Sequence, residues 1–145
     1  MLKYIIVLLI LATAVAAYGD EETIPELVTR ADAAPLDQQP ELYTKIAEKQ
    51  LKNADHLYDQ GKVEDAGSCV KDVVTYSEKA ADTSIRSGKR LKNTEIAFRK
   101  MSTRLRDIQR TVSFDDQVPL KAAADRLEDL RTNLLSRMFS KDKKK

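Results

Sequence analysis

The sequence contains few of the residues that usually stabilise small domains through covalent or metal cross-links. Its 145 residues include one cysteine, one histidine, four glycines, four prolines and no tryptophan. One cysteine cannot form a disulfide within the chain, and structural zinc sites need several cysteine or histidine ligands. We therefore expect the fold to be stabilised by the packing of apolar side chains.

Motifs that mark common enzyme and cofactor sites are also absent. The sequence has no Gly-x-x-x-x-Gly-Lys or Gly-x-Gly-x-x-Gly loop, no Gly-x-Ser-x-Gly turn, no pair of Glu-x-x-His motifs and no Cys-x-x-Cys-His. The single histidine, His56, lies one residue before an apolar helix stripe. We predict a protein that is not an enzyme and binds no cofactor and no metal.

A long apolar run occurs only at the beginning of the chain. One lysine at position 3 precedes the run from Tyr4 to Tyr18, and either Ala14-Val15-Ala16 or Ala17-Tyr18-Gly19 offers the small residues of a cleavage site. This is the layout of a cleaved secretory signal peptide, here residues 1–19. The alternative is a membrane anchor, but the run has 15 residues and a membrane-spanning helix needs about 20. We expect an exported protein, periplasmic or extracellular, with no transmembrane segment after cleavage.

Charge is distributed unevenly although the net charge is only +2. Residues 20–66 hold 12 acidic and 5 basic side chains, and residues 89–110 hold 8 basic and 2 acidic ones. The basic segment is a candidate surface for an anionic partner such as lipid headgroups or envelope polymer. Alternatively, it lies against the acidic helix 40–60 or is solvated. Because the protein is expected outside the cytoplasm, we expect no nucleic-acid partner. The candidate residues are Lys89, Arg90, Lys92, Arg99, Lys100, Arg104, Arg106 and Arg110.

The N-terminal part of the mature chain predicts a short helix followed by a long one. Thr23, Pro25 and Glu26 form a helix-start pattern, so we predict a helix over 25–33 within an N-terminal segment 20–36. A second apolar stripe with spacings of three and four predicts a helix over 40–60 that ends at Gly61.

Residues 63–112 carry apolar or small residues at alternating spacings of three and four over seven heptads. One helix of about 50 residues would satisfy this pattern. However, the middle of the stripe is weak in apolar residues, and Gly88 is a plausible break. A turn there gives four helices of about 22 residues (40–60, 63–86, 90–112 and 117–139), which suits an antiparallel bundle.

The predicted fold is therefore all-α, an antiparallel helical bundle of about four long helices over 37–139, plus the short N-terminal helix. The alternative is one long helix, 63–112, with flanking antiparallel helices. The last helix opens at Asp116-Gln117-Val118-Pro119, and residues 140–145 form a basic tail.

Cys69 falls on the helix predicted to begin at Val63. We interpret it as a small, half-buried helix residue, and an intermolecular disulfide is the alternative.

The turn between the second and third helices lies within a pattern of small, apolar and glycine residues: Ala54, Leu57, Gly61, Val63, Ala66 and Val70. This pattern resembles a single tetratricopeptide-like helical hairpin, from Ala54 to Val70. In that family such hairpins are stacked into arrays that form a peptide-binding groove. A generic helical hairpin is the alternative, and no second copy follows 34 residues later. As a whole, the chain also resembles small exported bacterial helical proteins.

Two functional hypotheses follow. The first is an interaction or scaffold protein of the cell envelope, with a protein partner or a second copy of itself. The second is a module that binds anionic envelope polymer or a membrane surface through residues 89–110. Loss of binding in added salt would favour the second hypothesis.

Overall fold

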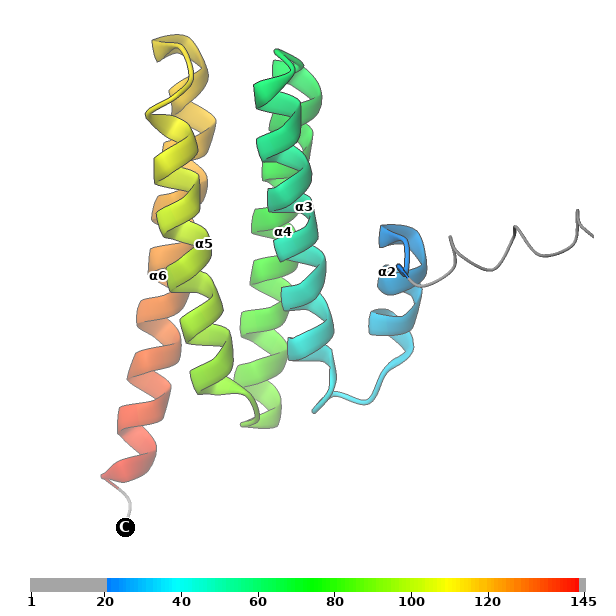
Figure 1. The fold of residues 1–145 in the computed structure, drawn as a ribbon. Helices are drawn as coiled ribbons and strands as arrows, with labels where there is room; N and C mark the ends of the chain where they lie inside the picture. The colour runs from blue at the N-terminus through cyan, green and yellow to red at the C-terminus, as the bar shows by residue number, and fades with distance from the viewer. Residues whose placement is uncertain (1–20, 144–145) are drawn as a thin grey trace, which may run out of the picture.

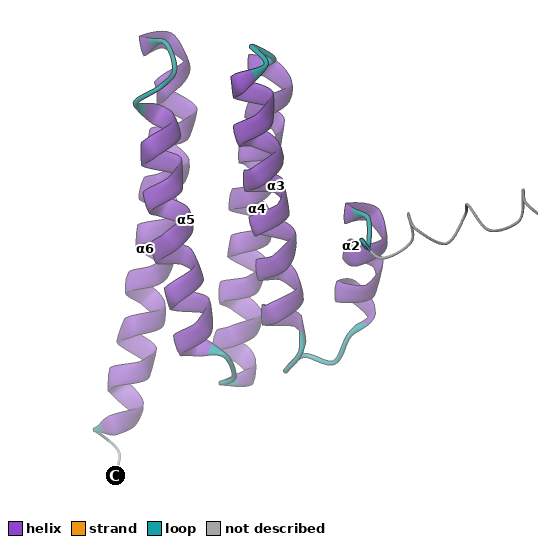
Figure 2. Cartoon of the chain, in the orientation of Figure 1, coloured by secondary structure: helices purple, strands orange, loops and turns teal. Residues whose placement is uncertain are grey.

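The computed structural model describes residues 21–143, which form five α-helices and one short 3₁₀-helix (Figures 1 and 2). The predicted signal peptide 1–19 and the last two residues of the predicted tail lie outside this range. The structure is an all-α antiparallel bundle, as the sequence predicts. Its elements are α2 (Ile24–Ala33), α3 (Gln39–Asp59), α4 (Val63–Ser87), α5 (Leu91–Gln109), η2 (Phe114–Asp116) and α6 (Gln117–Asp142).

Helix α2 begins with the capping box that the sequence predicts. The Thr23 side chain accepts a hydrogen bond from the Glu26 amide, and the Glu26 side chain accepts one from the Thr23 amide. Leu27 and Ala31 are fully buried. Across the contact with α3, the Tyr43 hydroxyl donates a 2.6 Å hydrogen bond to Asp32. The apolar face and this bond hold α2 against α3.

The alternative of one helix over 63–112 is wrong because the chain reverses at Gly88. Helix α4 ends at Ser87, and Gly88 adopts a left-handed conformation with φ of 68°. Glycine reaches this region without the steric cost that a Cβ imposes. The Ser84 hydroxyl donates a 2.6 Å hydrogen bond to the Lys89 carbonyl and so satisfies an acceptor in the turn.

The four long helices form two antiparallel hairpins, α3–α4 and α5–α6, which pack side by side. Helix α3 lies next to α5 in one layer, and α4 lies next to α6 in the other (Figures 1 and 2). Neighbours within a layer therefore run in the same direction. Helix α2 packs against the side of α3 away from α5 (Figure 1).

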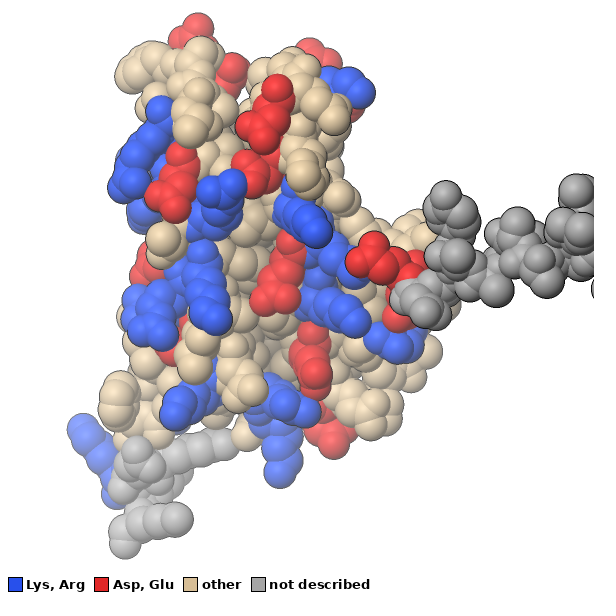
Figure 3. All heavy atoms as spheres, in the orientation of Figure 1, with Lys and Arg blue, Asp and Glu red and all other residues tan. Residues whose placement is uncertain are grey.

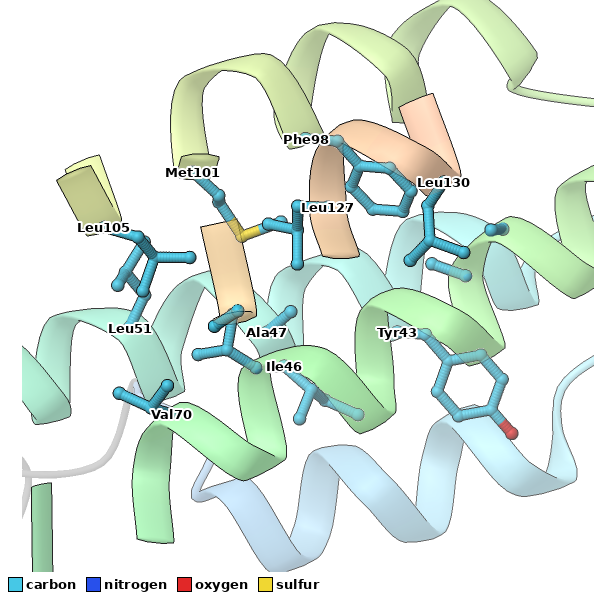
Figure 4. Packing of buried hydrophobic residues seen from close by; sticks show 14 of the residues in the cluster. Tyr43, Ile46, Ala47, Leu51, Val70, Phe98, Met101, Leu105, Leu127 and Leu130 are labelled. Atoms are coloured by element: carbon cyan, nitrogen blue, oxygen red, sulfur yellow. The ribbon is translucent and has the colours of Figure 1, made fainter. Parts of the chain in front are cut away.

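The core lies where the two hairpins meet (Figure 4). Phe98 of α5 is completely buried, with Leu127 of α6 and Ile46 of α3 buried in the same cluster. Burying side chains of this size stabilises the fold by about 1.5–3 kcal/mol each. Truncation of Phe98 to alanine would cost about 3–5 kcal/mol, because a cavity remains.

The weak middle of the predicted stripe is also buried. Ser77 and Ser84 are fully inaccessible, and Ala80 lies between them. Ser84 is hydrogen-bonded to the turn, but the Ser77 hydroxyl has no partner among the described residues. Small side chains at these positions leave room for the neighbouring helices in the core.

Candidate functional site

A groove runs between α3 and α5 along the layer that these two helices form. It consists of two hollows of about 400 and 290 Å³, and Glu48 lines both. We call it the α3–α5 groove. The lining side chains recur at helical spacing on each helix: Glu41, Thr44, Lys45, Glu48, Leu51, Lys52 and Asp55 from α3, and Asn93, Thr94, Ala97, Lys100, Met101 and Arg104 from α5, with Arg90 just before it.

The floor of the α3–α5 groove is apolar and its walls are charged. Leu51, Ala97 and Met101 belong to the floor and are 3–8% exposed. The Thr44 hydroxyl oxygen is buried and has no hydrogen-bond partner among the described residues. Such a floor can contact an apolar side chain of a partner. The charged walls then favour particular charges on the neighbouring residues of that partner.

Ion pairs cross the groove near its two ends. At one end Arg90 Nη2 lies 3.0 Å from Glu41 Oε2, and at the other Arg104 pairs with Asp55. The hydrogen bond to the Asp55 carboxylate raises the pKa of Arg104 above its ordinary value. All four side chains are partly solvated, so each pair stabilises the fold by at most about 1 kcal/mol.

Positive charge is in excess between these two ion pairs. Lys45, Lys52 and Lys100 have no carboxylate within 4 Å among the described residues. The only carboxylate in this central part is that of Glu48. Burial raises the pKa of Glu48, and the charge of Lys100 partly offsets that effect. Three ammonium groups and one carboxyl group therefore line the central part of the groove.

The structure divides the eight basic residues of segment 89–110 into different environments. Arg90 and Arg104 pair with the acidic helix α3, as one alternative expects, and Arg106 lies 2.9 Å from Asp125 of α6. Arg110 pairs with Asp107 on its own helix. The other four are not within 4 Å of any described carboxylate: Lys89, Lys92, Arg99 and Lys100.

Of these four, only Lys100 lines the α3–α5 groove. Lys92 and Arg99 are exposed and lie seven residues apart, so they share one side of α5. Figure 3 shows Lys and Arg side chains gathered over α5 and its boundary with α3, with Asp and Glu between them. The segment contributes to the groove and also to a solvated outer surface.

Other residues that the sequence singles out lie apart from the groove. His56 is exposed, and Cys69 is a half-buried, free cysteine on α4. Within the described residues, no cluster of three or more His, Cys, Asp or Glu side chains is arranged to hold a metal ion. None of the helices in this part of the chain is long and apolar enough to cross a membrane.

Sequence reasoning missed the contribution of α3 to the groove. Lys45, Glu48 and Lys52 flank the apolar stripe of α3, and this periodic position was the only available signal. It could not identify α5 as the neighbour of α3, because that depends on how the two hairpins stack.

Comparison of the chain with protein-family models, curated proteins and solved structures found no match.

Proposed function

We propose that this protein is a non-enzymatic helical interaction module that binds a segment of a partner protein in the α3–α5 groove. The observation that carries the proposal is the combination of an apolar floor with three lysines that have no ion-pair partner among the described residues. Leu51 and Met101 offer contact for an apolar side chain, and Lys45, Lys52 and Lys100 favour an acidic one. The partner segment would contain acidic residues close to a residue such as leucine.

The stacking of two helical hairpins supports this proposal, because the groove forms between equivalent helices of neighbouring hairpins. We extend the tetratricopeptide-like interpretation only as far as the Ala54–Val70 hairpin, whose turn is made by Gly61 with φ of 73°.

Two fluorescent peptides of equal length provide a direct test. One carries glutamates next to leucines, and the other carries lysines at the same positions. We expect the acidic peptide to bind and the basic one not to bind. Lys100→Glu should weaken binding by roughly tenfold. Lys92→Glu is the matched control, because Lys92 is an exposed lysine on the same helix that does not line the groove. Equal binding of both peptides, or equal effects of the two substitutions, would contradict the proposal.

The proposal places this activity outside the cytoplasm, in the cell envelope. The support is the apolar run with its small-residue end within residues 1–19. Mass spectrometry of the protein purified from the cell tests whether the N-terminal segment is removed. Loss of about 19 residues is the expected result, and an intact N-terminus would contradict export by a cleaved signal.

The second candidate function is binding to an anionic membrane or envelope polymer. The exposed Lys89, Lys92 and Arg99, which have no ion-pair partner among the described residues, favour it. Vesicles with and without phosphatidylglycerol provide the test at low and high salt. This function predicts retention on the anionic vesicles only, loss of retention in salt, and weaker retention for Lys92→Glu and Arg99→Glu. A variant with Lys100→Glu and intact Lys92 separates this function from groove binding.

A further inference from the structure

A separate hollow of about 490 Å³ lies between α4 and α6, and its lining is more apolar than that of the α3–α5 groove. We call it the α4–α6 hollow. Among the described residues, the charged ones in its lining are Lys71 and Arg126. Arg126 donates a 2.9 Å hydrogen bond to Glu78, whereas Lys71 has no ion-pair partner among the described residues. The remaining lining residues are small or apolar: Gly67, Val70, Val74, Thr75, Pro119, Ala122 and Ala123.

The turn between α5 and α6 presents the opposite chemistry. Phe114 is 83% exposed and Val118 is 68% exposed, which makes them two of the three exposed large apolar side chains of the described residues. We call residues 113–116 the tip. Asp115 and Asp116 follow Phe114 directly, and the tip contains no cation. The Ser113 hydroxyl donates a 2.7 Å hydrogen bond to Asp116, which helps to keep the tip ordered.

We propose that two copies of this chain associate by inserting the Phe114 tip of each copy into the α4–α6 hollow of the other. The aromatic ring matches the apolar lining. The two aspartates match the cations of the rim, where Lys71 has no ion-pair partner among the described residues and Arg126 shares its charge with Glu78. A second copy of the chain is the occupant that the charges favour, because the same chain carries both the acidic, aromatic tip and the cationic, apolar hollow.

The position of the tip allows a closed, two-fold exchange. The hollow is lined by Pro119 and Ala122, five and eight residues after Phe114, so tip and hollow lie at the same end of the molecule. A two-fold axis between them lets both contacts form at once, and no open-ended chain of copies results. The contact area is small, so the dimer is weak and depends on concentration. The α3–α5 groove takes no part, so this proposal is independent of the proposed function.

Sedimentation equilibrium across the micromolar to millimolar range tests the proposal on the full-length protein, in the N-terminal form that the expressing cell accumulates. We expect a monomer–dimer equilibrium. Phe114→Ser should raise the dissociation constant by roughly tenfold or more. Phe139→Ser is the matched control, because Phe139 is 64% exposed on α6 but lies outside the hollow and the tip. It should leave the dissociation constant unchanged.

A mixing experiment separates exchange from other modes of association. Ala122 is exposed, so Ala122→Glu should block the hollow and leave the tip and the fold intact. Each single variant loses both contacts of its dimer, whereas a heterodimer of Phe114→Ser with Ala122→Glu keeps one, so an equimolar mixture should associate more strongly than either variant alone. Circular dichroism spectra equal to those of the parent protein check that both variants are folded.

Three results would overturn the proposal: a monomer at every concentration, an equal effect of Phe139→Ser, or a mixture that associates no more strongly than either variant alone.

Discussion

Arg131 of α6 donates a 2.6 Å hydrogen bond from Nε to the carboxylate of Glu95 on α5, and the Glu95 side chain is only 9% exposed. The same guanidinium lies 3.1 Å from Glu128, which also accepts a 2.5 Å hydrogen bond from Ser102. The bond from Ser102, and next the one from Arg131, lower the pKa of Glu128. The Glu128 carboxylate is therefore stabilised in its ionised form, and the same arginine donates a hydrogen bond to the confined Glu95 carboxylate.

Loss of this arginine should be far more costly than loss of an exposed one. Arg131→Met leaves the Glu95 carboxylate buried without a cation, and we expect a loss of about 3 kcal/mol in the free energy of unfolding. Arg126→Met is the control on the same helix. Its partner Glu78 is 45% exposed, so the loss should stay below about 1 kcal/mol. Urea denaturation measures both, and equal losses would show that Glu95 is not confined as the structure indicates.

Two glycines should respond to alanine with opposite signs. Gly61 ends the α3–α4 turn with φ of 73°, a region that costs an alanine about 1–2 kcal/mol. Gly67 lies inside α4, and a Cβ added there meets nothing within 4 Å. Gly67→Ala should therefore stabilise the protein by about 0.5–1 kcal/mol through helix propensity. Thermal unfolding of the two variants checks this, and a stabilising Gly61→Ala would contradict the turn geometry.

The helices themselves could be predicted from the sequence because their signals are local. The capping box at Thr23, the permissive glycines at 61 and 88, and the recurring apolar residues each act within a few positions along the chain. Observed ends differ from the predicted ones by a few residues, as with α5, which ends at Gln109 rather than at 112. The last turn of a helix depends on tertiary contacts as much as on propensity.

The arrangement of the helices could not be predicted in this way. The spacing in α5 shows which side is apolar, but not whether α3 or α6 contacts its charged flank. The structure places α3 on the side of Lys100 and Arg104, and α6 on the side of Arg106. The groove exists because the packing of the whole core determines which helices lie next to each other. The sequence alone shows the basic segment. It does not show which carboxylates form ion pairs with half of its basic residues.

The contact between α2 and α3 should weaken at high pH. Burial, and next the hydrogen bond to Asp32, raise the pKa of Tyr43 to about 12. Because this pKa lies above the value of about 10 in the unfolded chain, the contribution to stability is complete below pH 10. It is lost as the pH rises from 10 to 12. Above pH 10 the folded protein must either keep the Tyr43 hydroxyl protonated, which costs free energy, or lose its hydrogen bond to Asp32.

Tyr43→Phe tests this titration. The substitution removes the hydrogen bond to Asp32, so it should cost about 1 kcal/mol at neutral pH. It should also make stability fall less steeply between pH 10 and pH 12. Urea midpoints at several pH values measure both effects. The same slope in the parent protein and the variant would show that Tyr43 does not titrate with a raised pKa.

Cys69 should react slowly with thiol reagents in the folded protein. Burial, followed by the charges of Asp72 and Asp65, raises the pKa of its thiol. The thiolate is the reactive form, so the alkylation rate at pH 8 should increase when the chain is unfolded in urea. In the folded protein, the midpoint of the rate profile should lie above the ordinary value of a cysteine.

Asparagine substitutions separate the effect of the two acidic neighbours on the pKa of Cys69 from the effect of burial. Asp72→Asn removes the charge with the larger effect but keeps an oxygen that can accept the 2.8 Å hydrogen bond from Gln50. It should therefore lower the pKa of Cys69 and raise the alkylation rate more than Asp65→Asn does. Asp82→Asn is the control, because Asp82 pairs with Arg86 and makes no contribution to the shift of Cys69. If all three variants react like the parent protein, burial alone limits the reactivity of Cys69, and the two acidic neighbours have no influence on it.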